Sequence, residues 1–537
     1  MAFIRARWLV LAAAAAVLVL HALAFNFVTD DAYISFVYSR NFAEHNELSF
    51  NLGQPVEGYT SFLWTVVIGL GMKAGLAPEL LSLVLGTACA VGTLVVTFRL
   101  IERVLARTTW WACVPPLLLA SSSGFACWSS GGLETQLFTL LVVASIDGVV
   151  SAAGRPGAIR RAAILLAFAA MTRPEGLLVA AALGLTHVIS VALVWWQWGR
   201  RRFPSDELVA AMLFLVIWGA WFFWRYRYYG HLWPNTYYVK AAGEWTDPKL
   251  AKQSLDNGLY YVWVWVRQTK LLFALPLAVL GFIVGAPRSP RSVLAMASMF
   301  IAGGYLTYAV TVGGDFMGLH RFIMPVFVIA ALAVTLGLEW VTSWFHGMAR
   351  RIVAVTASVA LVAAFALTQY QLTRDSVRWG NWANDNGLID TPAFLIVYTA
   401  DRAAIGRAMA SCFRDDDFSI VGGAGAQPYY GRMRAIDVFG LVSDRIAHES
   451  PRSRARAGHT KWGADSLLAE YNPTFVFSCY AIHKTPTPPP LPCNVGFWIA
   501  RGFQRVTMHI PGMRQSGEYY TFLASKARDF QCPGRVD

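Results

Sequence analysis

Two adjacent carboxylates, Asp30 and Asp31, stand directly after the first long apolar stretch of the sequence. That stretch, roughly 8–27, is long enough to cross a bilayer, because a crossing needs about 20 apolar residues. Arg5 and Arg7 precede it without an acid, so the positive-inside rule leaves the N-terminus in the cytoplasm. The aspartates then emerge on the opposite face. A carboxylate pair at a membrane surface is costly to place, and we therefore expect a catalytic site on the outer side.

Composition indicates a polytopic membrane protein. Of the 537 residues, 56% are hydrophobic and only 14% are charged, whereas soluble domains carry about 25% charged residues. A cleaved signal peptide is the alternative for the first stretch, but no clear small-x-small cleavage site follows it and many similar runs come later. The formal charge of +13 is spread over short loops, where it meets the lipid bilayer. This distribution argues against a nucleic-acid partner, which needs one basic face.

Basic loops separate the later apolar runs. The loops cover residues 99–107, 155–161, 200–202, 288–291 and 350–351. The runs cover about 80–98, 111–128, 133–151, 162–171, 177–196, 208–224, 271–285, 293–312, 322–345 and 352–367. Placing all five loops in the cytoplasm gives a consistent alternation with about 11 transmembrane helices. If the run 61–76 crossed the membrane, every later loop would change sides. We therefore predict a re-entrant or interfacial segment there.

The character of the chain changes after about residue 368. Residues 369–537 mix strand-like and helix-like segments, which predicts a C-terminal extracytoplasmic α/β domain beside a transmembrane domain at 1–368. The alternation places this domain on the side of the first outer loop, about 28–60. Its four cysteines form an even set in an oxidising compartment and allow up to two disulfides. They are Cys412, Cys479, Cys493 and Cys532, and three pairings stay open.

Polar outer loops supply candidates for binding a phosphate. Arg173 lies in a turn with Glu175, where its guanidinium could fork onto a phosphate or the two side chains could satisfy each other. The glycine-rich stretch 313–321 offers Asp315 to a sugar and His320 and Arg321 to a phosphate, or it is a structural turn. We carry Arg173, His320 and Arg321 as candidate phosphate ligands.

Candidates for binding a sugar or an acceptor occur in the same outer loops. Glu134 begins a helix, where helix capping is the competing interpretation. Aromatic residues of the loop 231–240 are otherwise typical of an interfacial belt. The candidate sugar or acceptor ligands are Tyr33, Glu57, Tyr59, Glu134, Glu175, His231, Asn235, Tyr237, Lys240 and Asp315.

Other catalytic motifs are missing from the sequence. The glycine-rich stretch 422–430 lacks the strand–GxGxxG–helix context of a nucleotide site. There is no Walker motif, no HExxH and no nucleophile elbow.

Taken together, these segments resemble the GT-C superfamily of glycosyltransferases. Within it, the chain is similar to relatives of the mycobacterial terminal arabinofuranosyltransferase. The resemblance rests on DDAYI (30–34), EGYTS (57–61), GGLET (131–135), TRPEG (172–176), GGDFM (313–317) followed by Arg321, AGAQPYY (424–430) and IDVFGLV (436–442). Each motif is short, but their order and their common side are hard to imitate.

The resemblance implies an inverting transfer of a sugar from a polyprenyl-phosphate carrier to a cell-envelope glycan or glycoconjugate. The catalytic acid of the family maps onto Asp30 or Asp31, and arabinofuranose is the leading sugar. It also implies a bacterial inner-membrane protein with its site on the outer face. Some family members use a divalent metal ion, for which Asp30 and Asp31 are the candidate ligands here.

Two other functions compete with this interpretation. A transporter or flippase for lipid-linked glycans places polar groups near the bilayer midplane and shows repeats. In this sequence the acids cluster at helix exits, and no internal repeat is visible. A non-catalytic membrane scaffold whose outer domain binds glycan is the second alternative.

Overall fold

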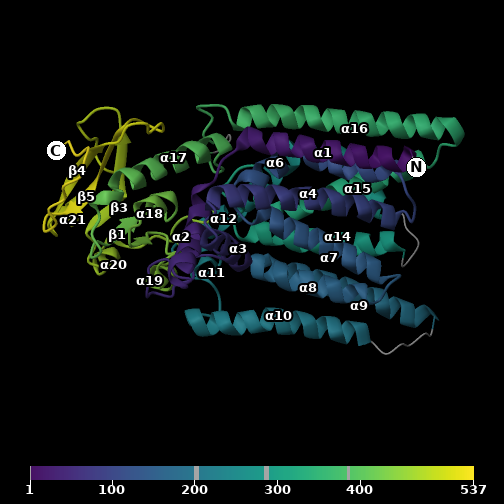
Figure 1. The fold of residues 1–537 in the computed structure, drawn as a ribbon, viewed down its shortest axis with the longest axis horizontal. Helices are drawn as coiled ribbons and strands as arrows, with labels where there is room; N and C mark the ends of the chain where they lie inside the picture. Colours follow the sequence, from purple (N-terminus) through teal and green to yellow (C-terminus); the bar gives the residue numbers. More distant parts are fainter. Residues whose placement is uncertain (1, 199–204, 284–288, 384–386, 537) are drawn as a thin grey trace.

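The computed structural model describes residues 2–198, 205–283, 289–383 and 387–536. Long helices lie side by side in a bundle, and a small sheet domain caps one end of it (Figure 1). Within the described ranges, eight helices are long and apolar enough to cross a membrane, or nine if one bent pair counts as a span. The predicted helical membrane fold with a C-terminal α/β part is confirmed, although with fewer spans than the sequence predicts.

Eight helices are candidate membrane spans in the described part of the chain. They are α1 (Ala2–Phe25), α4 (Pro78–Val104), α7 (Thr135–Ala152), α9 (Glu175–Trp198), α10 (Ser205–Tyr229), α14 (Pro290–Thr311), α15 (Met324–Thr342) and α16 (Gly347–Ser376). The bent pair is α12 (Pro248–Gln268) and α13 (Leu271–Ile283), which meet at 88°. Residues 200–202, 284–285 and Arg288, which belong to predicted loops and runs, lie outside the described residues.

The predicted run 111–128 is not one helix. It forms η1 (Trp110–Cys113), α5 (Val114–Ser121) and α6 (Ser123–Ser130). Ser122 is extended between α5 and α6, and its Oγ accepts the N–H of Phe125, which starts a new helix. A serine cap therefore outweighs the continuous apolar pattern. The short helix α8 (Ala158–Thr172) and α9 form the hairpin that turns at 172–176.

Arginines from three of the basic loops meet at the end of the bundle opposite the sheet domain. Glu339, near the end of α15, pairs with Arg107 at 2.8 Å, Arg291 at 3.4 Å and Arg350 at 3.6 Å. These arginines come from three of the predicted basic loops. In Figure 1 this end lies at the right, beside the N-terminus. Three of the loops that the sequence assigns to the cytoplasm therefore share one end of the molecule.

The other end carries short helices around the predicted outer loops. Residues 30–45, expected as part of a loop, form α2 (Asp30–His45), which begins with the two aspartates and ends before left-handed Asn46. Carboxylates in a first turn complement the helix dipole, which favours this start. The run at 61–76 forms α3 (Phe62–Lys73), whose 12 residues rise about 18 Å and cannot cross a bilayer of about 30 Å. The helix α11 (Asn235–Lys240) and η2 (Arg321–Ile323) complete this end.

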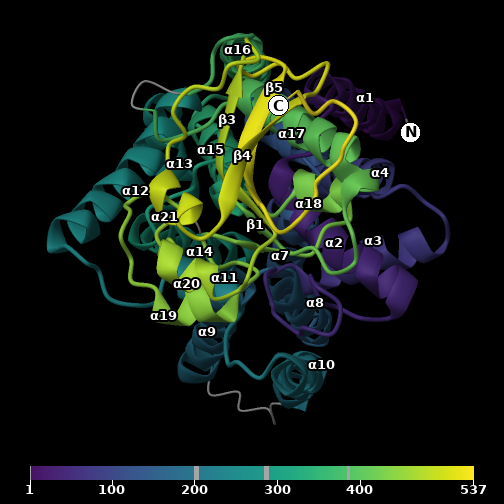
Figure 2. The same cartoon turned by 90° about the vertical axis from the view of Figure 1, so that its left-hand side faces the viewer.

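The C-terminal part contains one five-stranded sheet in the order β2-β1-β3-β5-β4. The strands β1 (Ser419–Val421), β2 (Ala435–Asp437) and β3 (Phe475–His483) pair in parallel. The strands β4 (Phe503–His509) and β5 (Tyr519–Ser525) continue the sheet as antiparallel neighbours. Figure 2 shows these strands over the end of the helix bundle.

Short helices surround this sheet. They are α17 (Pro392–Met409), η3 (Ala410–Cys412), α18 (Ala426–Gly431), α19 (Asp444–Glu449), α20 (Asp465–Ala469) and α21 (Val495–Ile499). Cys412 bonds to Cys532 and Cys479 bonds to Cys493, which resolves the pairing that the sequence left open. The first bond ties the end of α17 to the C-terminal tail.

Candidate active site

A cavity of about 330 Å³ opens at the end of the bundle that faces the sheet domain. Several predicted site residues gather in its wall, and they come from α2, α9, α11, η2 and the turns next to α3, α7 and α8. The predicted residues in the lining are Asp31, Tyr59, Glu134, Arg173, Glu175, Tyr237, Lys240 and Arg321. We call this space the cation-lined cavity. Trp233, Tyr308 and Phe322 also line it and were not among the predicted residues.

Arg173 forms the ion pair with Glu175 that the sequence allowed, and it lines the cavity as well. Its Nη1 lies 3.1 Å from Glu134 Oε1 and its Nη2 lies 2.9 Å from Glu175 Oε1, with all three side chains buried. The guanidinium also lies over the Phe322 ring, 5.0 Å from its centroid. Arg173 is thus held rigidly in the cavity wall, while two carboxylates compensate its charge.

Arg321 and His320 follow the glycine-rich turn but face different surroundings. Arg321 Nε lies 2.7 Å from Asp315 Oδ2, and both side chains are buried. His320 Nε2 instead lies 2.7 Å from Gln268 Oε1, in a separate small cavity. Burial lowers the pKa of His320 to about 3, so this imidazole is neutral at pH 7. His320, one of the predicted phosphate ligands, therefore does not line the cation-lined cavity, whereas Arg321 does.

Lys240 is the last residue of α11 and lines the same cavity. Among the cations that line the cavity, it alone forms no ion pair with a described residue. Burial lowers its pKa, and the positive charge of Arg321 acts in the same direction. Asp31 opposes this shift. Lys240 is therefore the cation whose charge is least compensated by the protein.

The two aspartates have different roles in the structure. Asp30 is buried, and its Oδ1 accepts the N–H of Ala426 at 2.8 Å, which joins α2 to α18. A Cβ at position 425 would lie 2.1 Å from the Asp30 carbonyl oxygen, so only glycine fits there. Burial raises the pKa of Asp30 to about 6.

Asp31 is half-buried and lines the cation-lined cavity. Burial raises its pKa, while the nearby charges of Arg321 and Lys240 oppose the shift. The Asp30 carboxylate thus accepts a hydrogen bond from a backbone amide, whereas the Asp31 carboxylate lies near the cations Arg321 and Lys240. This arrangement does not fit a divalent ion shared by Asp30 and Asp31, because such an ion needs several oxygen ligands around it.

A second cavity, of about 320 Å³, lies between the bundle and the C-terminal domain. Asp31, Ile34 and Leu441 belong to the linings of both cavities, so the two spaces meet at Asp31. The other residues that line the second cavity are mostly aromatic or charged, and we call this second space the aromatic cavity. Its lining includes Asp30, Phe316, Asp390, Tyr398, Asp437, Phe439, Arg454, Arg456, His459, Trp462 and Tyr480.

The C-terminal residues of the aromatic cavity were not among the residues predicted from the sequence. One signal was present: three arginines stand at alternate positions, 452, 454 and 456, in the outer domain. Nothing in the sequence relates these positions to Asp31. Their proximity depends on how the C-terminal domain packs onto α2.

The remaining predicted residues support the site from outside its walls. Glu57 accepts two hydrogen bonds from Arg225, at 2.6 and 2.9 Å, and its carbonyl accepts the N–H of Asn235. This network holds the start of α11. The Tyr33 hydroxyl lies 3.1 Å from the hydroxyl of Tyr430, which belongs to α18. Asp315 orients Arg321, and His231 lies beside α19, away from both cavities.

Comparison with solved structures identifies the fold. The chain is similar to ArnT from Cupriavidus metallidurans bound to undecaprenyl phosphate, with a TM-score of 0.58 and 12% identity over 96% of this chain and 98% of that chain. The apo state of ArnT matches with a TM-score of 0.56 and 12% identity over 96% and 97% of the two chains. No family model and no curated sequence matches significantly. The likeness is one of fold, and it extends along nearly the whole chain, both the helical bundle and the C-terminal domain.

Proposed function

We propose that this protein is an inverting glycosyltransferase that moves a sugar from a polyprenyl-phosphate carrier to a glycan acceptor. The observation that carries the proposal is the position of Asp31, where a cation-lined cavity meets an aromatic one. The similarity to ArnT, crystallised with undecaprenyl phosphate, supports a lipid phosphate as the carrier.

The cation-lined cavity suits the donor. Leu177 at the start of α9 and Val312 at the end of α14 form part of its wall, and both helices are candidate spans. A polyprenyl chain can therefore follow the apolar helix surfaces while its phosphate meets Lys240, Arg173 and Arg321. Charge-assisted hydrogen bonds of this kind are stronger than neutral ones, and arginine matches phosphate geometry.

The aromatic cavity suits the acceptor glycan. Aromatic faces such as Tyr398 and Trp462 can pack against the apolar faces of sugar rings. Carboxylates accept hydrogen bonds from sugar hydroxyls, and guanidinium groups donate to them. Asp390 and Arg456, paired at 2.8 Å, offer both kinds of group in this wall.

Asp31 is the group that can act on both substrates. In the proposed step its carboxylate takes the proton of the acceptor hydroxyl, whose oxygen bonds to the anomeric carbon. The bond from that carbon to the phosphate oxygen breaks on the opposite face, and the electron pair stays on the phosphate. Lys240, Arg173 and Arg321 stabilise the charge that develops there. Burial raises the pKa of Asp31 towards the operating pH, and a general base is most effective when its pKa lies near that pH.

The finer identity of the reaction comes from the sequence resemblance. It makes arabinofuranose the proposed sugar and a cell-envelope glycan or glycoconjugate the proposed acceptor. We place the protein in the bacterial inner membrane with both cavities outside. Two observations support this side: arginines from three of the basic loops meet at the opposite end, and two disulfides lie in the C-terminal domain.

Lipid extraction from cells that lack the protein tests the proposal. We expect one polyprenyl-phosphate sugar to accumulate, as measured by mass spectrometry. The wild-type chain should clear this pool, and the Asp31→Asn variant should not, although it reaches the membrane in equal amounts. An unchanged set of lipid-linked sugars would contradict the proposal and favour a glycan-binding scaffold.

A further inference from the structure

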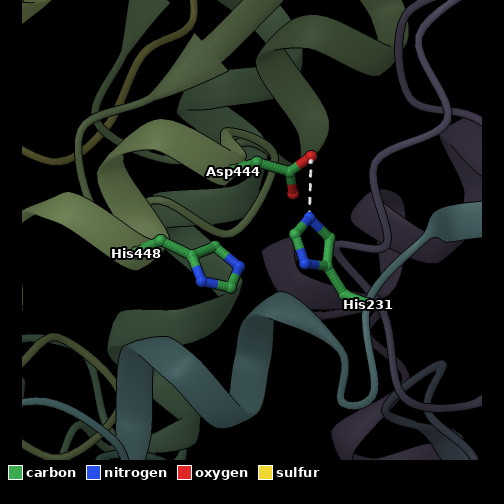
Figure 3. Close-up of side chains that lie close together, drawn as sticks. All are labelled: His231, Asp444 and His448. Atoms are coloured by element: carbon green, nitrogen blue, oxygen red, sulfur yellow. Dashed lines mark ion pairs between the residues drawn. The ribbon is translucent and has the colours of Figure 1, made fainter.

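Three side chains with metal-binding atoms converge at the edge of the C-terminal domain, apart from both cavities. His231 lies between α10 and α11, whereas Asp444 and His448 belong to α19. One ligand atom from each lies within 4.8 Å of the others. Figure 3 shows the two α19 side chains facing His231 across the gap between the segments. In the described part of the chain, this is the one group of three such side chains that gathers in this way.

We propose that His231, Asp444 and His448 bind a zinc ion that fastens the segment before α11 to the C-terminal domain. Asp444 and His448 are four residues apart on one helix, so they share a face. His231 Nε2 lies 3.7 Å from Asp444 Oδ2, and the His231 and His448 rings stack with centroids 4.5 Å apart. Asp444 Oδ1 is buried without a hydrogen-bond partner.

The donor set selects zinc among common divalent ions. Two imidazole nitrogens and one carboxylate oxygen are a frequent three-ligand zinc set, with a fourth position left for water. Calcium and magnesium prefer oxygen ligands throughout. Tetrahedral zinc with bonds of about 2.0–2.2 Å separates its ligand atoms by roughly 3.3 Å. The ligand atoms now lie within 4.8 Å of one another, with His231 Nε2 and Asp444 Oδ2 3.7 Å apart, so the side chains would rotate to close around an ion. Their partial exposure lets the ion enter.

The position of this site gives the ion a structural effect on the cation-lined cavity. The segment that begins at His231 continues into α11, which carries Tyr237 and Lys240 into the cavity wall. It already touches the C-terminal domain, because Asn235 Nδ2 donates to Leu441 O at 3.3 Å and Arg452 Nη2 donates to Lys240 O at 2.9 Å. A zinc ion would add a stronger link to this interface. His231 and His448 would thereby act as positioning residues for Lys240.

Zinc binding can be measured without any transfer assay. The full chain, purified without a histidine tag, is stripped with EDTA, dialysed and titrated with zinc chloride. We expect about one zinc ion per chain by mass spectrometry of the metal. We also expect a zinc-dependent rise in the thermal unfolding midpoint, because the ion binds the folded chain alone. His231→Ala and His448→Ala should each weaken zinc binding by more than about 100-fold, beyond the usual effect of removing a supporting residue.

A matched control and a conservative variant keep the result interpretable. His346 is an exposed histidine before α16, at the other end of the molecule, and His346→Ala should bind zinc as the wild type does. His448→Gln keeps a polar side chain, and its unfolding midpoint without zinc should equal that of the wild type. Absence of bound zinc in the wild type, or equal binding by all variants, would overturn the proposal. Zinc binding in a chain without transfer activity would instead contradict only the proposed function.

Discussion

The three cations of the cation-lined cavity differ in how the protein compensates their charge. Arg173 contacts two carboxylates and Arg321 contacts one, whereas Lys240 pairs with none of the described residues. A phosphate that enters the cavity therefore finds its least satisfied partner at Lys240. The arginines are held in fixed orientations, which suits the stabilisation of charge that develops during transfer.

Replacing Lys240 should weaken donor binding. A hydrogen bond to a charged group contributes about 1.5–3 kcal/mol, and each 1.4 kcal/mol changes affinity tenfold. We therefore expect Lys240→Met to raise the KM for the lipid-linked sugar about 10- to 100-fold, and Lys240→Arg to raise it less. Steady-state kinetics with the purified enzyme checks this. Lys249→Met, at an exposed position on α12, serves as the control. Equal KM values for both methionine variants would contradict the role of Lys240.

Asp30 should affect stability in a pH-dependent way. Its folded-state pKa of about 6 lies above the ordinary 3.8, so folding favours the protonated form. The stability that this group contributes is therefore full below pH 3.8 and is lost as the pH rises through about 6. Asparagine keeps the acceptor for the Ala426 N–H without the buried charge.

The matching measurement is the thermal unfolding midpoint of Asp30→Asn and wild type at pH 4 and pH 7. We expect the variant to gain stability relative to wild type between pH 4 and pH 7. A relative loss at pH 7 would mean that the ionised carboxylate, opposite Arg402, stabilises the fold.

Contacts between residues close in the sequence could be predicted, whereas contacts between residues far apart in the sequence could not. Arg173 and Glu175 could be predicted as partners because two positions separate them. Arg456 and Phe439 could not be related to Asp31, since about 400 residues lie between them and tertiary packing alone brings them together. His320 was assigned to a phosphate because of its neighbour Arg321, but left-handed backbone at His320 turns the two side chains to different sides.

At the scale of elements, the contact between α2 and α18 joins the membrane bundle to the sheet domain. A Cβ at Gly425 would meet the Asp30 carbonyl oxygen at 2.1 Å, whereas a Cβ at Gly422 would meet nothing within 4 Å. Overpacking of this kind typically destabilises a protein by about 1–3 kcal/mol. We expect Gly425→Ala to lower the unfolding midpoint and slow transfer, while Gly422→Ala keeps the unfolding midpoint of the wild type. Equal effects of the two substitutions would contradict the importance of this contact.

Periodicity and length predicted the long helices better than the short ones. The continuous apolar run 111–128 hid a break at Ser122, because a single capping hydrogen bond ends one helix and starts another. Residues 30–45 were expected in a loop because polar side chains dominate their start. Ten of the sixteen α2 residues are nevertheless buried, since both the bundle and the C-terminal domain cover this helix. The alternation of the basic loops did predict that the run 61–76 does not cross, and the 12-residue helix α3 agrees with this.

The whole molecule has two chemically different ends, and this predicts its orientation in the membrane. Arginines from three loops meet Glu339 at one end, and the disulfide-bonded domain covers the other. The positive-inside rule and the need for an oxidising compartment assign these ends to opposite sides. Alkaline phosphatase fused after the C-terminus should be active, and the same reporter fused at Arg351 should be inactive. The reverse pattern would place both cavities in the cytoplasm and contradict the proposed reaction.

The order of polar outer loops and basic inner loops was enough to predict the class of fold. It was not enough to predict a site built by two parts of the chain. Asp31 borders a cavity from each part, whereas the buried Asp30 holds those parts together. The structure thus separates two adjacent aspartates that the sequence left equivalent, and it makes Asp31 the proposed base.

Transfer rates of Asp31→Asn and Asp30→Asn, measured with saturating lipid-linked donor, test this assignment most directly. General base catalysis contributes about 10²- to 10⁴-fold. We expect Asp31→Asn to lose transfer by that factor while it still binds the donor, and Asp30→Asn to retain most of its rate. Wild-type turnover by Asp31→Asn would contradict the assignment.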